Sequence, residues 1–227
     1  MFEKYDAYKD SSVEWIGKIP SHWEIKKNKY LFEEVNIRSE NGAEELLSVS
    51  QYTGVSLKKD KINENGMLTN AESLEGYKVV KSGNLVINIM LAWNGSLGVS
   101  QYNGIVSPAY DVFLLKDYCT QYFHYLLRTE MYKAEYKRKS TGVIESRLRL
   151  YSDSFFSIKS IVPSILEQRQ IAKFLEQKTS EIDQAIAIKE QQIALLNERK
   201  QIVIQKAVTQ GLDPNVPMKD SGVEWIG

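Results

Sequence analysis

Positively charged residues concentrate in one part of the sequence, on and just after a predicted helix. Tyr132 and Tyr136 lie among them, and the interspersed glutamates are outnumbered. Lysine and arginine neutralise DNA phosphates, and an arginine in the major groove can read guanine with two hydrogen bonds. The cluster therefore indicates a DNA contact, although a solvated helix face would have the same composition. The predicted contact residues are Lys133, Lys137, Arg138, Lys139, Ser140, Thr141 and Arg147, with Arg128 and Arg149 at the two ends of the cluster.

Two short polar segments elsewhere have side chains of the kinds that read base edges. Tyr52 and Thr53 precede a glycine, and Asn94 and Ser96 flank another. Hydroxyl and amide groups can hydrogen-bond to bases in the grooves of DNA. These four residues are therefore added to the predicted DNA contacts. Plain turn chemistry explains each of them equally well and stays open as the alternative.

Residue patterns typical of catalysis are missing. The sequence contains no phosphate-binding Gly-x-x-x-x-Gly-Lys loop, no Gly-x-Gly-x-x-Gly fingerprint and no Gly-x-Ser-x-Gly elbow. His22 and His124 are the only histidines and Cys119 is the only cysteine, which are too few for a zinc site of histidines or cysteines. We therefore expect no catalytic residue, no metal and no cofactor.

The overall composition is that of a globular protein rather than of an obviously basic DNA-binding protein. Of 227 residues, 43% are hydrophobic and 26% are charged, and the formal net charge is zero. This balance argues mildly against a nucleic-acid partner, although only the contacting face must be positive. The sequence has neither an apolar run long enough to span a membrane nor an apolar signal core, and we expect a cytoplasmic protein.

The elements that would position these residues are of mixed type. Alternating apolar residues predict strands at 45–49, 85–90 and 111–115, and turn signals separate them. Helices are predicted at 29–35 and 121–139. We therefore expect an α+β protein, in which residues 1–162 form one globular α/β domain.

A long helix is predicted after Pro163. Ser164 and Glu167 form a capping box, and the next glycine is Gly211. The helix 163–210 would be about 70 Å long. Its apolar residues recur with an average spacing near 3.5, which predicts a coiled coil with a partner helix. An amphipathic helix folded back on its own domain is the alternative. The predicted dimerisation residues are Ile171, Leu175, Ile182, Ile186, Ile193, Leu196 and Val203.

One nine-residue sequence occurs twice. KDSSVEWIG at 9–17 recurs as KDSGVEWIG at 219–227, with a single difference. A repeat at this distance predicts a structural unit of about 210 residues. We therefore interpret residues 211–227 as a linker and the beginning of a second unit.

Three segments together resemble the specificity subunit, HsdS, of type I restriction-modification systems. Residues 13–23 resemble the opening of a target recognition domain, and 104–110 resemble a strand-turn motif within it. Residues 161–163 followed by 167–175 resemble the start of the family's spacer helix. The resemblance extends over nearly the whole chain. It departs from the family in having one recognition domain and one spacer helix, so the chain looks like a half-subunit.

The resemblance implies a function that involves no catalysis by this chain. Each recognition domain of the family reads one part of a split target in double-stranded DNA. Methyltransferase subunits dock on the paired antiparallel spacer helices, and a separate restriction subunit completes the complex. For this chain we expect a homodimer on an inverted repeat. The alternative is an interaction protein that competes for methyltransferase subunits and does not itself read DNA.

Overall fold

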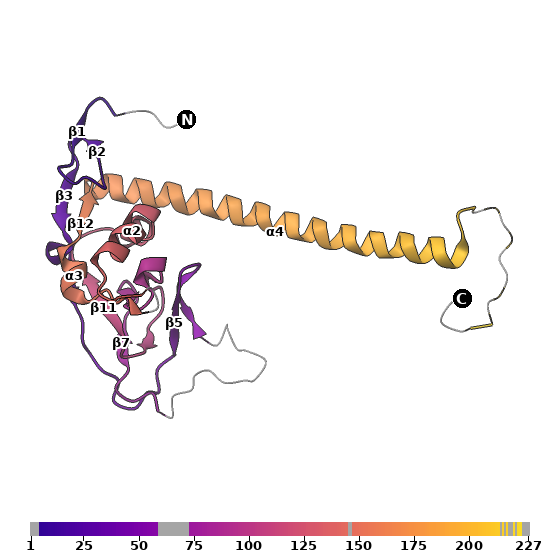
Figure 1. The fold of residues 1–227 in the computed structure, drawn as a ribbon, viewed down its shortest axis with the longest axis horizontal. Coiled ribbons are helices and arrows are strands. Elements are labelled where there is room, and N and C mark those ends of the chain that lie inside the picture. Colours follow the sequence, from indigo (N-terminus) through magenta and orange to yellow (C-terminus); the bar gives the residue numbers. More distant parts are fainter. Residues whose placement is uncertain are drawn as a thin grey trace. The chain divides into compact units, whose positions relative to one another are not determined.

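The computed structural model describes residues 5–58, 73–144 and 147–213, together with 215, 217, 220, 222 and 223 (Figure 1). It divides into two compact units, Met1–Lys173 and Phe174–Gly227. The first unit is a mixed α+β domain, and the second contains most of a long helix. The predicted α+β class and the predicted long helix are therefore confirmed.

The first unit is built from short strands and short helices. Its strands are β1 (Tyr8–Asp10), β2 (Lys18–Pro20), β3 (Glu24–Lys27), β4 (Phe32–Glu34), β5 (Leu47–Ser50), β6 (Gly54–Leu57), β7 (Lys78–Val80), β8 (Leu85–Asn88), β9 (Leu97–Val99), β10 (Gly104–Val106), β11 (Tyr110–Leu115) and β12 (Lys159–Val162). Its helices are the 3-10 turns η1 (Asn28–Tyr30) and η3 (Ala92–Asn94), and α1 (Thr120–Leu126), α2 (Glu130–Lys139) and α3 (Ser152–Ser157); α4 (Ile165–Gln210) begins in this unit.

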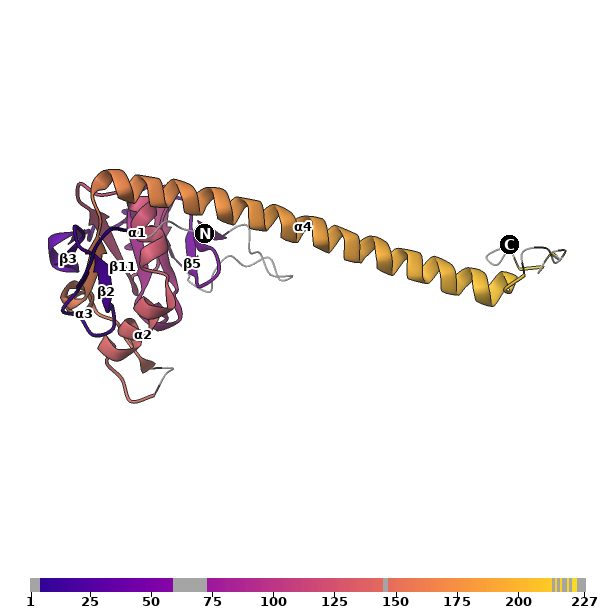
Figure 2. The same cartoon turned by 90° about the horizontal axis from the view of Figure 1, so that it is seen from above.

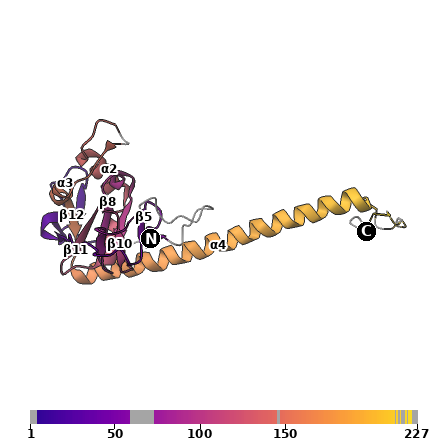
Figure 3. The same cartoon turned by 90° about the horizontal axis from the view of Figure 1, so that it is seen from below.

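A four-stranded antiparallel sheet lies at the centre of this domain, in the order β4-β11-β8-β9. Side chains of a strand alternate between the two faces of its sheet. In β8, Leu85 and Ile87 accordingly belong to one core cluster with residues of α1, α2 and α3, whereas Val86 belongs to a second cluster with residues of β5, β6, β7 and β10. The sheet is therefore buried on both faces. Figures 2 and 3 show the domain from two further directions.

Two predicted helices differ from the structure. Residues 29–35 form η1 and β4, because Phe32–Glu34 pairs with Phe113–Leu115 of β11 and this tertiary pairing outweighs local propensity. The predicted helix 121–139 is divided into α1 and α2 before Thr129, whose backbone is extended (φ −71°, ψ 155°). The three predicted strands are confirmed as β5, β8 and β11, with shifted ends.

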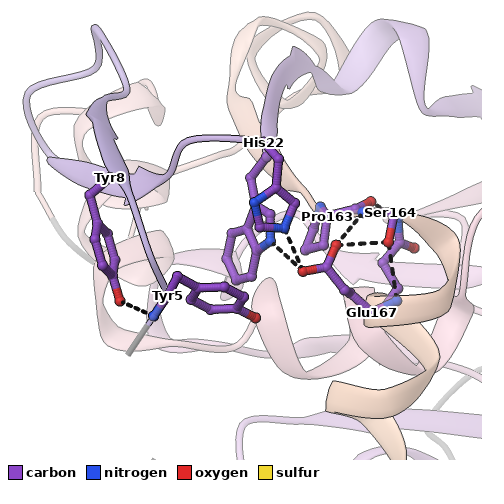
Figure 4. Close-up of polar contacts among 8 residues, drawn as sticks. Tyr5, Tyr8, His22, Pro163, Ser164 and Glu167 are labelled. Carbon is purple, nitrogen blue, oxygen red and sulfur yellow. Dashed lines mark hydrogen bonds and ion pairs between the residues drawn. The ribbon is translucent and has the colours of Figure 1, made fainter. Parts of the chain in front are cut away.

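The start of α4 is fixed by the carboxylate of Glu167 (Figure 4). The backbone N–H of Ser164 donates to Glu167 Oε2 at 3.2 Å, and the backbone N–H of Glu167 donates to Ser164 Oγ at 3.3 Å, which confirms the predicted capping box. The other oxygen, Oε1, lies 2.7 Å from His22 Nε2 and accepts a hydrogen bond from Trp23 Nε1 at 3.0 Å. One side chain thus joins the N-terminal segment to the first turn of the helix.

The second unit contains the part of α4 that runs from Phe174 to Gln210. Of its predicted coiled-coil side chains, Leu175 is partly buried, whereas Ile182, Ile186, Ile193, Leu196 and Val203 are exposed, from 50% for Ile186 to 63% for Leu196. No second helix that could cover them is described within this unit. Ile171 lies in the first unit, where it is partly buried and packs against the core cluster of its own domain. None of the described helices combines the length and apolar character that crossing a bilayer requires.

The two copies of the repeat share a local turn. The backbone N–H of Ser12 donates to Asp10 Oδ1 at 2.7 Å, and that of Gly222 donates to Asp220 Oδ1 at 2.8 Å. Ser12 and Gly222 both have left-handed backbones, with φ of 56° and 69°. The single difference between the copies, Ser12 against Gly222, therefore lies at a left-handed position, which glycine adopts without the steric cost that a side chain brings. Most of the second copy, including 224–227, lies outside the described residues.

Candidate nucleic-acid interface

The turn between β5 and β6 presents an aromatic side chain to solvent. Tyr52 at its tip is 83% exposed. The hydroxyls of Thr53 and Ser50 are hydrogen-bonded to each other at 2.9 Å, and the backbone N–H of Thr53 donates to Ser50 Oγ at 3.2 Å. Internal bonds thus order the turn while its tip stays accessible.

The second predicted segment begins at Asn94, the last residue of η3, and is a tight turn. Asn94 Oδ1 accepts hydrogen bonds from the backbone N–H of Ser96 at 3.1 Å and from its hydroxyl at 2.8 Å, and Gly95 has φ of 91°. Ser96 is only 3% exposed. Its hydroxyl therefore stabilises the turn and is not presented at the surface, which corrects its predicted role as a DNA contact. Asn94 remains partly accessible.

Two lysines of α2 lie against this turn. A Cβ added to Gly95 would come within 2.6 Å of Lys133 Cε, so the Lys133 side chain crosses directly over the glycine. Lys137 Nζ lies 5.9 Å from the centre of the Trp93 ring, in cation–π contact. Lys133 Nζ also pairs with the exposed Glu130 at 2.8 Å. The structure thus brings a predicted loop and two predicted lysines together.

We call this area the loop–helix surface. It consists of Trp93, Asn94, Lys133 and Lys137, together with Tyr52 and Thr53, whose turn Arg128 joins to Leu97 just after the Asn94 turn. It combines two ammonium groups with two aromatic rings and with hydroxyl and amide groups. Such a surface can neutralise phosphates and contact bases by hydrogen bonding or stacking.

Other residues of the basic cluster point elsewhere. Tyr132 and Tyr136 are fully buried in the core, and burial raises the pKa of Tyr132 to about 12. Arg138 makes two hydrogen bonds to the buried Glu135, from Nε at 2.6 Å and from Nη2 at 2.7 Å. It lies on a different face of α2 from Lys133 and Lys137, which are four residues apart. The four-residue spacing of Lys133 and Lys137 is the feature of the sequence that assigns both lysines to one face of α2 and Arg138 to another.

The segment after α2 forms a second, separate loop. Ser140 donates its hydroxyl hydrogen bond to the Tyr136 carbonyl at 2.8 Å. Thr141 and Arg149 exchange two backbone hydrogen bonds of 2.9 Å and so close the loop. Thr141 and Arg147 are exposed, and Lys139 and Ser140 are partly buried. These four residues, with Arg138, remain predicted contacts that the structure does not place on the loop–helix surface.

The environment of Arg128 is a feature of the site that the sequence does not reveal. Arg128 counts as one more basic residue in the cluster, yet it is partly buried and donates to the main-chain carbonyls of Leu97 and Gln51. Its two terminal nitrogens are therefore engaged by the main chain of the protein itself. Among the described residues, no group of three His, Cys, Asp or Glu side chains is arranged to hold a metal ion.

The fold is shared with solved structures, although no family model and no curated protein matches the chain. The HsdS subunit from Thermoanaerobacter tengcongensis matches with a TM-score of 0.56 at 12% identity, over 88% of this chain and 52% of that one. A chain from work on complex assembly and conformational transition of the type I R-M system matches with a TM-score of 0.59 at 12% identity, over 90% and 53%. The chain thus spans about half the length of these structures.

Proposed function

We propose that this chain is a DNA-reading component of a type I restriction-modification complex and has no catalytic activity of its own. The observation that carries the proposal is the loop–helix surface, built on the fold that the chain shares with solved HsdS structures. Lys133 and Lys137 would neutralise phosphates, and Tyr52, Thr53 and Asn94 would lie nearest to the bases.

The partner that covers α4 is, in this proposal, the α4 helix of a second copy. Residues 174–190 contain four acidic and two basic side chains, whereas 191–210 contain one acidic and three basic side chains. Antiparallel pairing would place each acidic half beside a basic half. It would also cover Ile182, Ile186, Ile193, Leu196 and Val203, which are exposed in the single chain.

Such a dimer would supply two copies of one reading domain. Two-fold symmetry then requires an inverted repeat as the target, with a gap fixed by the helix pair. By analogy with the complexes to which HsdS belongs, methyltransferase subunits would bind the paired helices directly, and restriction subunits would join through the complex.

The test is the salt dependence of duplex DNA binding, measured by fluorescence anisotropy. Replacing Lys133 and Lys137 with alanine should weaken binding to all sequences and reduce the slope of log K against log salt by about one unit for each lysine. Lys116→Ala is the matched control. Lys116 is exposed and directly follows β11. The opposite end of β11, at Tyr110, pairs with Asn88, which shortly precedes η3, so Lys116 lies at the end of the strand away from the η3 loop.

Two results would contradict the proposal. The first is the absence of duplex binding by the wild-type chain even at low salt. The second is an unchanged slope in the double lysine variant. Binding of methyltransferase subunits by a chain that ignores DNA would favour the competitor function instead.

A further inference from the structure

Arg128 holds the two candidate base-reading loops by their main chains. It lies between α1 and α2. Its Nη1 donates to the Leu97 carbonyl at 2.6 Å, one residue after the Asn94–Ser96 turn, and more weakly to Ser50 at 3.4 Å. Its Nη2 donates to the carbonyls of Gln51 at 2.8 Å and Tyr52 at 3.0 Å. A single planar group therefore joins the Tyr52 turn to the first residue of β9, directly after the Asn94 turn.

The backbone at Gly54 is closely packed against Arg128 and its neighbours. A Cβ on Gly54 would lie 3.1 Å from Arg128 Nη1, 3.1 Å from His124 Cε1 and 3.7 Å from the Cα of Gly98. Gly54 has φ of 69°, a conformation that favours glycine. The two backbones thus approach each other closely beneath the guanidinium group.

His124 completes the support from α1. Its Nδ1 accepts the backbone N–H of Val99 at 3.2 Å, which requires the neutral ring. Burial and the positive charge of Arg128 lower the pKa of His124 to about 4. The imidazole therefore stays neutral at physiological pH and does not repel the arginine.

The two terminal nitrogens of Arg128 are already engaged inside the protein. Its guanidinium is partly buried, and carbonyl oxygens occupy both terminal nitrogens. A phosphate contact through either terminal nitrogen would compete with these hydrogen bonds, and part-buried carbonyls that lose their donors destabilise the fold.

We propose that Arg128 is a positioning residue that sets the spacing between the Tyr52 turn and the Asn94 turn, and so determines base selectivity without touching DNA. The inference rests on the proposed function. A lysine cannot replace it, because one ammonium group lacks the planar fork that reaches both loops.

The experiment compares Arg128→Lys, Arg128→Met and Lys137→Ala with the wild type. The probes are the duplex that the wild-type chain enriches from a randomised pool and a scrambled duplex of equal length. Both Arg128 variants should lose at least tenfold in the ratio of the two affinities, with an unchanged salt slope on scrambled DNA. Lys137→Ala should lower the slope by about one unit and keep the ratio.

A salt slope reduced by about one unit in Arg128→Lys or Arg128→Met, with selectivity retained, would overturn the inference, because Arg128 would then contact phosphate. An unchanged ratio and an unchanged slope in folded variants would overturn it too. If the wild-type chain enriches no sequence, the proposed function itself fails, which is a separate outcome.

A measurement on the wild type keeps the inference testable if the variants do not fold. In ¹⁵N-arginine NMR, the guanidinium protons of Arg128 should exchange slowly and keep their shifts when the enriched duplex is added. Shifts that follow DNA binding with the size expected of a phosphate contact would contradict the inference.

Discussion

At the scale of single residues, Glu167 determines how the domain passes into its long helix. Its carboxylate accepts hydrogen bonds from Trp23 and from Ser164 and lies 2.7 Å from His22 Nε2 (Figure 4). Burial alone would raise the pKa of Glu167, but these hydrogen bonds outweigh it and lower the pKa to about 2. The ionised form is therefore the one that the fold stabilises.

The lowered pKa predicts an acid-dependent loss of stability. A carboxylate with a folded-state pKa below its ordinary value of 4.5 stabilises the fold fully above that value, and the contribution is lost as the pH falls towards about 2. Glu167→Gln should lower the free energy of unfolding by about 1–2 kcal/mol at pH 7 and remove this part of the acid dependence. Urea unfolding at several pH values measures both effects.

The control for this prediction is Glu33→Gln, an exposed glutamate on β4. It should leave the stability at pH 7 unchanged. An acid dependence in Glu167→Gln equal to that of the wild type would show that Glu167 does not stabilise the fold through its charge.

Residue types were easier to predict than side-chain directions. The sequence predicts Lys133, Lys137, Tyr52 and Asn94 as contacts, and the structure places them on the loop–helix surface. Ser96 faces inward because its hydroxyl completes the Asn94 turn. Arg128 faces inward because carbonyls from two distant segments meet there. Such long-range contacts follow from the fold and leave no local pattern in the sequence.

At the scale of elements, α4 is the part that the sequence predicts best. A capping box, a 3.5-residue apolar period and a closing glycine are all local signals, and the observed helix Ile165–Gln210 agrees with them. The helix predicted at 29–35, which the structure does not contain, shows the opposite case. There, β4 forms because it pairs with β11, more than 70 residues along the chain.

The exposed stripe of α4 makes a prediction about assembly. Ile193→Lys should place a charge at the centre of the proposed helix pair. The dissociation constant of the dimer should therefore rise at least a hundredfold, which corresponds to about 3 kcal/mol. Gln191→Lys is the control, because it adds the same side chain about 200° around the helix. Sedimentation equilibrium measures both variants. A monomeric wild type, or equal effects of the two lysines, would contradict pairing through this stripe.

At the scale of the whole molecule, the sequence contains one α+β domain, one long helix and a second copy of the nine-residue segment 9–17. The structure shows the same turn at Ser12 and Gly222. This chain spans about half the length of the solved structures that share its fold. In the proposed dimer, two copies joined through α4 would supply two identical reading domains.

The most direct measurement is the sequence that the wild-type chain enriches from a pool of duplexes with a long randomised centre. The account predicts one short motif present twice, in inverted orientation and with a constant gap. Enrichment of no motif, or of a single motif without its inverted partner, would contradict a symmetric reader of DNA.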